Sequence, residues 1–274
     1  MRPLFAAVMF TACDSNSPSA PVPASRSLTA TDVGTAARDQ SSLKEKDGAT
    51  IVTATGDIAP AVGQFRTLLG GGLPNPNVAG EAAGGRREIN WDGVPAALTD
   101  NDLFPANFFN VNSPRGALFS TTGSAFRVDS TGFTRVNGAY AGEFNVFSPK
   151  KLFVARGSTI TDVRFVVAGS NTPALVTGFG SVFADVGRSQ STTIEFFDAA
   201  GALLLKVAAP RRSDEKGLSF AGAVFAVPTI ARVRITSGDT PIGPDELDNV
   251  KGAGKKRDIV AMDDFIYGEP HRIN

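Results

Sequence analysis

Short apolar runs that recur at roughly 8–12-residue spacing constrain the fold of this chain more than any other feature. From residue 115 onward, Gly, Pro, Asp, Asn or Ser bounds each run, and no long amphipathic helix separates them. Such spacing is typical of antiparallel sandwiches and barrels. The sequence therefore predicts an all-β domain, and we expect an antiparallel jelly-roll β-sandwich. The runs include GALFSTT, AFRVDS, KLFVA, ITDVRFVVAG, GFGSVFADVG, TTIEFFDA, ALLLKVAAP, LSFAGAVFAV, IARVRITSG and DIVAMDDFIYG.

Some local elements are also indicated. Residues 49–56 read as a first strand, and apolar residues near helical spacing over 58–69 favour a short helix or an irregular edge segment. Residues 70–85 are rich in Gly, Pro and Asn and predict a loop. The stretch TTIEFFDAAGALLLKV predicts a hairpin that turns at 198–201, because Gly201 accepts a positive φ.

The N-terminus resembles a bacterial lipoprotein signal. A basic Arg2 precedes the apolar run LFAAVMF, and Phe10-Thr11-Ala12-Cys13 resembles a lipobox, with Phe10 where Leu is usual. The alternatives are an ordinary signal peptide and an apolar N-terminus with a buried cysteine. We expect a signal segment over 1–12, a disordered tether over 13–48 and the β-sandwich over 49–274.

Cys13 is the only cysteine, so the chain forms no intrachain disulfide. The Ser- and Pro-rich stretch after it cannot bury enough apolar surface to offset its ordering entropy, which predicts a flexible tether. Acyl chains on Cys13 would attach the protein stably to a membrane. The expected location is the bacterial cell envelope or the extracellular side, anchored by lipid at Cys13.

Charge and composition exclude several function classes. The chain has 27 basic and 27 acidic residues, whereas a protein that binds nucleic acid through its phosphates is expected to carry a basic excess. The single histidine, His271, argues against a histidine-based catalytic triad or a polyhistidine zinc site. We expect a non-catalytic protein that does not bind nucleic acid.

The blocks GGRREINWDGVP, GFGSVFADVGRSQSTTIEFFDAAGALLLKVAAP, IARVRITSG and IVAMDDFIYGEP resemble a group of secreted bacterial proteins of unknown function. The resemblance covers roughly residues 84–270. It implies a jelly-roll sandwich similar to carbohydrate-binding modules and galactose-binding or lectin-like domains. Some members of the group carry C-terminal surface-sorting segments, and we expect the lipid at Cys13 to take their place.

Asp264 is the first candidate site residue. Strict alternation along IVAMDDFIYG puts Val260, Met262, Asp264 and Ile266 on one face, which is apolar except for Asp264. A carboxylate in a core needs a cation or several donors. A calcium ion is one interpretation, because Ca²⁺ prefers oxygen ligands and modules of the resembled type often hold structural calcium near a terminal strand. An arginine partner or backbone N–H groups are the other.

The segment REINWDG supplies the second candidate. If it is extended, Glu88, Asn90 and Asp92 share a face, and adjacent members lie about 6.8 Å apart. Asn90 and Asp92 are then the more plausible metal ligands, and a solvated face over a buried Trp91 is the alternative. Arg86 and Arg87 are also suited to pair with carboxylates of the last strand.

Two further acidic positions have ordinary explanations. Asp185 is a possible additional ligand, but an Asp at a strand end before Gly187 is usually part of a turn. The acidic loop 238–249 lacks the spacing of an EF-hand, so a solvated loop is expected.

Three functions remain open from the sequence. The first is a binding module for envelope or extracellular glycan, with Trp91, Tyr140 or Tyr267 exposed for sugar stacking. The second is a structural or adhesive lipoprotein without a small-molecule site. The third is a glycan-processing enzyme, which requires two carboxylates in a cleft roughly 5–10 Å apart.

Overall fold

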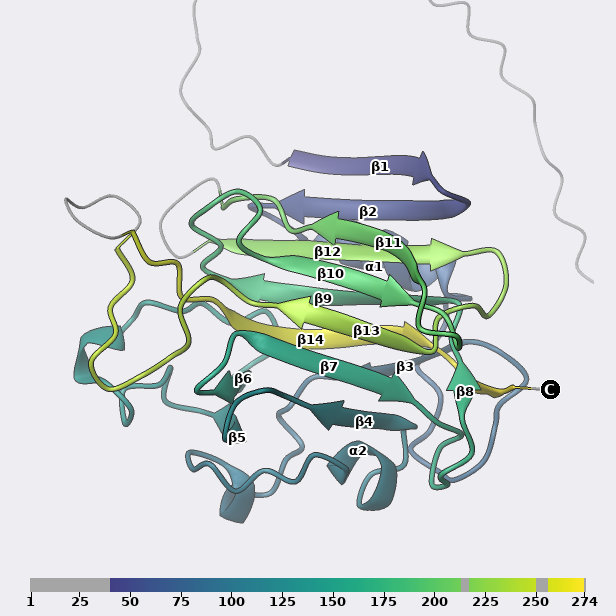
Figure 1. Cartoon of the computed structure of the whole chain (residues 1–274), viewed down its shortest axis with the longest axis horizontal. Helices are drawn as coiled ribbons and strands as arrows, with labels where there is room; N and C mark the ends of the chain where they lie inside the picture. Colours follow the sequence, from purple (N-terminus) through teal and green to yellow (C-terminus); the bar gives the residue numbers. More distant parts are fainter. Residues whose placement is uncertain (1–39, 213–216, 250–255, 274) are drawn as a thin grey trace, which may run out of the picture. The chain divides into compact units, whose positions relative to one another are not determined.

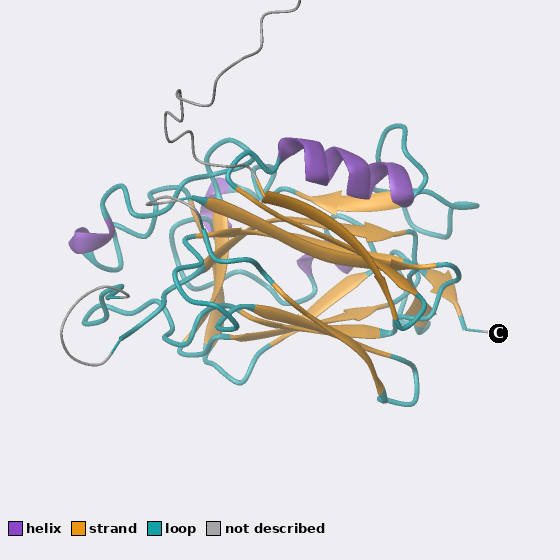
Figure 2. Ribbon diagram, turned by 90° about the horizontal axis from the view of Figure 1, so that it is seen from above, coloured by secondary structure: helices purple, strands orange, loops and turns teal. Residues whose placement is uncertain are grey.

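Two antiparallel sheets face each other in the computed structural model and enclose the main core (Figures 1 and 2). The model describes residues 40–212, 217–249 and 256–273, so Cys13 and most of the expected signal and tether lie outside the described residues. The predicted all-β antiparallel sandwich is confirmed, because every pairing between the described strands is antiparallel.

The larger sheet contains eight strands. Its order is β1 (Gln40–Lys46), β2 (Ala49–Thr55), β12 (Leu218–Phe225), β9 (Gly178–Ala184), β14 (Ala261–Gly268), β6 (Leu152–Arg156) and β5 (Ala125–Asp129), with β3 (Arg86–Ile89) also paired to β14.

The smaller sheet contains five strands. Its order is β11 (Leu203–Ala208), β10 (Thr193–Phe197), β13 (Arg232–Thr236), β7 (Ile160–Phe165) and β4 (Ala117–Ser120), and a separate pair joins β15 (His271–Arg272) to β8 (Ala174–Leu175). Successive strands from β6 to β14 pass repeatedly from one sheet to the other, as in a jelly roll.

The core between the sheets consists of the inward side chains of both. Phe179, Phe183 and Phe265 of the larger sheet meet Val163, Phe196 and Ile235 of the smaller one, and all six are fully buried. Alternate residues of a strand point to opposite faces, so the apolar positions of each short run collect on the inner side. The regular spacing of these runs is what made the sandwich predictable.

Helix α1 (Ala59–Leu68) covers the outer face of the larger sheet (Figure 2). Phe65 of α1 is fully buried against Val182 and Phe220. Gly180 and Gly222, which pair across β9 and β12, make this approach possible, because a Cβ on Gly222 would lie 2.7 Å from the Phe65 ring. The apolar spacing over 58–69 therefore forms a helix and not an edge segment.

The other helices are short. Helix α2 (Phe108–Val111) and the 3₁₀ helices at Ala96–Leu98 and Gly138–Tyr140 lie in the connections. The hairpin from β10 to β11 turns as predicted, with Gly201 at φ +84°. One boundary differs from the prediction, since β1 occupies part of the stretch assigned to the tether and pairs with β2 over its whole length.

A β-bulge in β14 changes the predicted face of its residues. Met262 pairs with Phe183 and Phe265 with Ser181 of β9, so β14 contains one extra residue at Asp263–Asp264. Before the bulge Met262 faces the main core, whereas after it Phe265 and Tyr267 do. Ile266 packs on the opposite face, under α1. The prediction that one face runs from Val260 through Asp264 to Ile266 is wrong for this reason.

Candidate functional site: a two-part cavity beside the β14 bulge

The bulge lies where two strands meet on one edge of β14. Residue Met262 pairs with Phe153 of β6, and Phe265 pairs with Ile89 of β3. Asp263 and Asp264 fall between these pairings, so neither is in register with β6 or β3. Side chains from other segments fill this position, and they form the site.

Asp263 is held by donors from the chain just before β6. Its carboxylate accepts from the backbone N of Phe147 at 2.6 Å and from Oγ of Ser148 at 2.8 Å. The indole Nε1 of Trp91 donates to the backbone oxygen of Asp263 at 2.7 Å. Burial, followed by the neighbouring charge of Asp264, raises the pKa of Asp263 to about 8.

Asp264 has a different environment. It is 3% exposed, and its Oδ2 lies 3.6 Å from Nη2 of Arg66 on α1. Its Oδ1 is buried and accepts no hydrogen bond from the described residues. Burial raises the pKa of Asp264. The predicted need for a partner is met by an arginine, the alternative to calcium.

Glu88 of β3 fixes Arg66. The guanidinium donates from Nε to Oε1 at 3.0 Å and from Nη2 to Oε2 at 2.8 Å, a two-pronged ion pair. Arg86 also donates to Glu88, at 2.6 Å. Arg66 thus links the carboxylates of Glu88 and Asp264.

These groups line a polar cavity of about 350 Å³. Its charged side chains are two arginines and two carboxylates, so their formal charges cancel. The side-chain amides of Asn77 and Asn90 are exposed on its wall and have no hydrogen bond with the described residues. The lining residues are Arg66, Pro74, Asn75, Asn77, Glu88, Asn90, Arg115, Phe147, Ser148 and Asp264.

A second cavity, of about 380 Å³, adjoins the first and shares Asn90 and Arg115 with it. The rest of its wall comes from Trp91, Gly93, Val94, Pro95, Phe108, Phe109, Asn112 and Ser113 and exposes polar and apolar surface in nearly equal amounts. We call the two the polar cavity and the mixed cavity.

Arg115 lies at their junction. Its guanidinium sits over the Phe109 ring, 4.9 Å from the centroid, and contacts Oγ of Ser113. The backbone is held by Tyr267, whose hydroxyl donates to the Arg115 oxygen at 3.0 Å. The Nε of Arg115 is buried and donates to no described residue. The unpartnered atoms Asp264 Oδ1 and Arg115 Nε therefore lie beneath the wall of the polar cavity and have no accessible surface in it.

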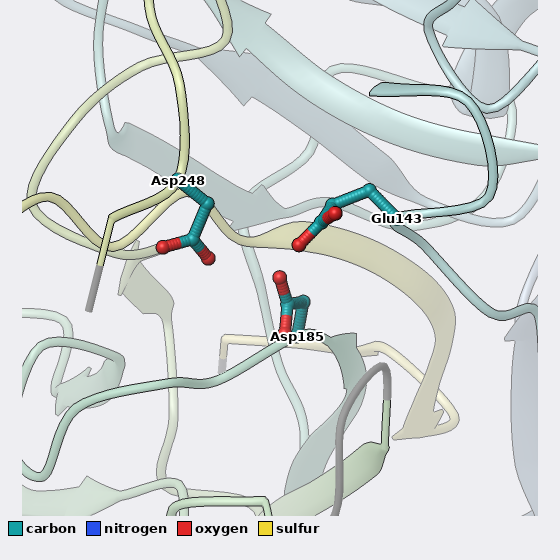
Figure 3. A group of neighbouring side chains, drawn as sticks. All are labelled: Glu143, Asp185 and Asp248. Carbon is teal, nitrogen blue, oxygen red and sulfur yellow. The ribbon is translucent and has the colours of Figure 1, made fainter. Parts of the chain in front are cut away.

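A separate acidic cluster contains Glu143, Asp185 and Asp248 (Figure 3). One carboxylate oxygen from each lies within 4.8 Å of the others. Asp185 is fully buried and forms an ion pair with Arg212. Neither oxygen of Asp248 accepts a hydrogen bond from the described residues. Burial raises the pKa of Asp185 and that of Asp248.

Tyr140 explains how this acidic cluster assembles. Its hydroxyl lies 2.8 Å from the backbone oxygen of Glu246 and 3.1 Å from that of Gly243. This contact holds the loop that carries Asp248 beside the turn that carries Glu143. Asp185 follows directly after β9, at a left-handed φ of +70°, as a strand-end turn residue.

The aromatic residues expected to stack on sugar are core residues. Trp91 and Tyr140 are each 1% exposed and Tyr267 is fully buried. Trp91 stacks on Phe153 at 4.0 Å between centroids, and its φ of +63° turns the chain away from β3. The expectation that these three rings form an exposed platform is wrong, although Trp91 is among the residues that line the mixed cavity.

The predicted metal ligands are not brought together as a set. Asn90 and Asp264 line the polar cavity, whereas Asp92 lies outside it and accepts from the backbone N of Lys151 at 3.1 Å. The extended geometry assumed for these residues ends with β3, because Asp92 N donates to Asn90 O in a tight turn at 2.7 Å. Arg87 pairs with Glu269 just beyond β14, not with Asp263 or Asp264.

Sequence reasoning missed Arg66, Arg115 and Glu143. Each reaches its site from a distant segment, and no local motif marks it. The candidate anchor, Cys13, lies outside the described residues.

Among the described residues, no helix combines the length and apolar character needed to cross a membrane. No family model, curated protein or solved structure matches the chain.

Proposed function

We propose that this chain is a non-catalytic binding module for an uncharged, hydroxyl-rich ligand, a unit of an envelope or extracellular glycan. The observation that carries this proposal is the wall of the polar cavity, where the side-chain amides of Asn77 and Asn90 are exposed and have no hydrogen bond with the described residues. An amide both donates and accepts, so each can bind a sugar hydroxyl.

The cavity supports an uncharged ligand with several hydroxyl groups. Its two arginines and two carboxylates balance, so a net charge on the ligand would gain nothing overall. A hydroxyl also both donates and accepts, so it can bond to the oxygen or the nitrogen of these amides. A volume of about 350 Å³ is near the lower end for ligand sites and suits one sugar ring.

Calorimetric titration with neutral glycans tests this function. We expect wild type to bind at least one of them and a variant with both Asn77→Ala and Asn90→Ala to bind about tenfold more weakly or worse, because each hydrogen bond contributes about 0.5–1.5 kcal/mol. Asp245→Ala, at an exposed position outside both cavities, is the matched control. Equal binding by the double variant, or no binding by wild type, overturns the proposal and favours a structural or adhesive role.

A second candidate is glycan hydrolysis, because Glu88 and Asp264 face one cavity with Arg66 between them. The two-pronged arginine contact ties Glu88 down, which disfavours it as a nucleophile. Release of reducing sugar from a bound glycan, lost in Glu88→Gln, would replace the binding proposal with an enzymatic one.

We also propose export and lipid attachment at Cys13. The support is the apolar run before this cysteine and the Ser- and Pro-rich stretch after it. Metabolic labelling with a fatty acid tests this: wild type in its native host should carry label in the membrane fraction, and Cys13→Ser should not. Label on the Cys13→Ser variant would contradict it.

A structural calcium ion is proposed at the acidic cluster and not at Asp264. Three carboxylates converge there, and Arg212 neutralises only one of them. Carboxylate oxygens are the ligands that Ca²⁺ prefers. A melting temperature that is the same with calcium and with EGTA would refute the ion.

A further inference from the structure

The outer face of the smaller sheet is a second surface, separate from the cavities beside β14. Its strands direct apolar residues such as Val233 and Ile235 into the core, so the residues that alternate with them point outward. In Figure 1 this sheet is nearest the reader, and no described helix or strand lies in front of β10, β13 and β7. The face is therefore open to a partner, whereas α1 covers the outer face of the larger sheet.

The strand register arranges the outward residues in two rows that cross the sheet. The first row alternates in charge and consists of Lys206, Glu195, Arg234, Asp162 and Ser120. The second row has two adjacent arginines between apolar residues and consists of Leu203, Phe197, Arg232, Arg164 and Leu118. The two rows together contain four cations and two carboxylates, which leaves an excess of two positive charges on this face.

Both carboxylates of the face already have partners within it. Asp162 accepts from Nε and Nη2 of Arg234, at 3.0 and 2.9 Å, and from Nη1 of Arg232 at 2.6 Å. Glu195 accepts from Nζ of Lys206 at 3.1 Å. The two acidic side chains are 13% and 23% exposed, whereas those of Arg234 and Lys206 are 40% and 51% exposed. A partner that approaches the face therefore meets its cations first.

Arg164 is the cation of this face that has no acidic partner. It is exposed and lies directly opposite Arg232 in the register, a position where like charges destabilise a sheet. The guanidinium of Arg232 is stabilised by Asp162 and by the ring of Phe197, whose centroid is 3.8 Å away. Among the residues that the structure describes, no carboxylate pairs with Arg164, and Nε and Nη2 of Arg232 donate to no acceptor. An anion between the two arginines would offset their repulsion and use these donors.

We propose that this face binds an acidic polysaccharide built of uronic acid units, and that Arg164 and Arg232 hold one of its carboxylates between them. The planar fork of arginine matches the two oxygens of a carboxylate. Asp162 provides the precedent within the same face, because its carboxylate is held between Arg232 and Arg234. The ligand carboxylate occupies the corresponding place on the other side of Arg232. This inference goes beyond the proposed function and does not depend on the cavities.

Other anionic partners fit this face less well. Anionic membranes attract clusters of about 4–8 basic residues, and duplex nucleic acid carries about one charge per 1.7 Å, so both call for more than two excess charges. A uronic acid polymer has one carboxylate on each sugar, with uncharged C–H and hydroxyl surface between them. The two arginines match such a carboxylate, and the half-buried side chains of Phe197 and Leu118 on either side offer apolar surface to the C–H groups.

Calorimetric titration of the full chain with polygalacturonate in low salt tests the proposal, with the methyl-esterified polymer as the uncharged probe. Wild type should bind the acid form about tenfold or more tightly than the ester, and added salt should weaken this binding. Arg164→Gln should weaken it about fivefold, the contribution of one well-formed exposed ion pair. Arg135→Gln is the matched control, because it removes the same charge from an exposed arginine outside the smaller sheet, and it should change binding little.

Asp162→Asn tests the same face in the opposite direction. It removes one of the two carboxylates and releases the donors of Arg232 and Arg234, so polygalacturonate should bind about twofold more tightly or better. An ion-pair network that only stabilises the sheet predicts no gain in affinity, and this result would overturn the proposal. Melting curves verify that the variants are folded.

The remaining outcomes also decide the proposal. No binding of polygalacturonate by wild type, or equal binding of acid and ester, overturns it. Equal weakening in Arg164→Gln and Arg135→Gln shows that overall charge is read and not this face. Tighter binding to dextran sulfate or to vesicles of anionic lipid assigns the face to a different partner. The variant with both Asn77→Ala and Asn90→Ala should bind polygalacturonate as wild type does, so failure here leaves the polar cavity and its neutral ligand untouched.

Discussion

The acidic pair at the β14 bulge and the acidic cluster at Asp185 both contain buried carboxylates but differ in their donors. Asp263 accepts two hydrogen bonds, and Asp264 has an arginine, so the bulge pair is largely satisfied by the protein. In the acidic cluster, Asp185 has an ion pair with Arg212, and among the described residues no backbone N–H or hydroxyl donates to Asp185 or Asp248.

This difference shows that donors, not burial, decide what a buried carboxylate can do. Burial raises the pKa in both places. At the bulge, donors from the protein hold the two carboxylates in place beside the polar cavity. In the acidic cluster the carboxylates face one another, so protons or a cation must relieve their repulsion.

The largest effect is expected from Asp263→Ala. It leaves the partly buried backbone N of Phe147 without an acceptor and removes the acceptor of the buried Ser148 hydroxyl, which should lower the free energy of unfolding by about 2–4 kcal/mol in urea denaturation. Asp248→Asn in EGTA is the contrasting variant: it leaves no described donor unpaired, and we expect no loss of stability. Similar losses in the two variants would erase the distinction between the two groups.

Calcium should change the stability of the protein by a smaller amount, through the acidic cluster and not through the bulge pair. At a hundredfold excess over the dissociation constant, a bound ion adds about 2.7 kcal/mol of stability, seen as a rise in melting temperature relative to EGTA. Asp185→Asn should abolish the rise and Asp264→Asn should keep it. A rise that disappears in Asp264→Asn instead would place the ion at the bulge.

The raised pKa of Asp263 at the bulge should make the stability of the protein depend on pH. The pKa of Asp263 is raised to about 8 in the folded state from an ordinary value of 3.8. The folded state thus binds more protons than the unfolded state between these values, so stability falls as pH rises through this window. The urea midpoint in EGTA should decline from pH 4 to pH 8, and less steeply in Asp263→Asn. A midpoint that rises with pH would show that both carboxylates are ionised in the fold.

The smallest effect is expected at the edge of the polar cavity. The side chains of Arg66 and Glu88 are 32% and 15% exposed, so Glu88→Gln should cost only about 0.5–1 kcal/mol in urea denaturation. A loss above about 2 kcal/mol would mean that Glu88, through Arg66, also secures α1.

The strands were predictable because their signal is local. The runs that became β9, β10 and β13 each contain apolar residues at alternate positions with turn residues at their ends. The Gly201 turn was predictable for the same reason. For residues 58–69 the sequence left a helix and an irregular edge segment open. The feature that allows α1 to pack on the sheet, the Gly180–Gly222 pair, lies far along the chain and has no local signal.

The site was less predictable than the fold. Asp264 was recognised as a carboxylate in need of a partner, but the bulge that redirects Phe265 and Tyr267 has no signal in an alternating pattern. Arg66 and Arg115 reach the cavity from segments about 200 and 150 residues away in the sequence. Trp91 was wrongly expected at a sugar platform, because its amphipathic character does not reveal the aromatic cluster that surrounds it.

Strand β1 has a mechanical consequence. It is an edge strand that pairs with β2 alone, and the chain enters the domain through it at Gln40. Any tension applied through the N-terminal segment thus reaches β1 before the rest of the domain. The β1–β2 ladder would open ahead of the sandwich under such a load. The strands around the β14 bulge would carry the tension only after this edge had detached, so β1 would act as the first element to yield.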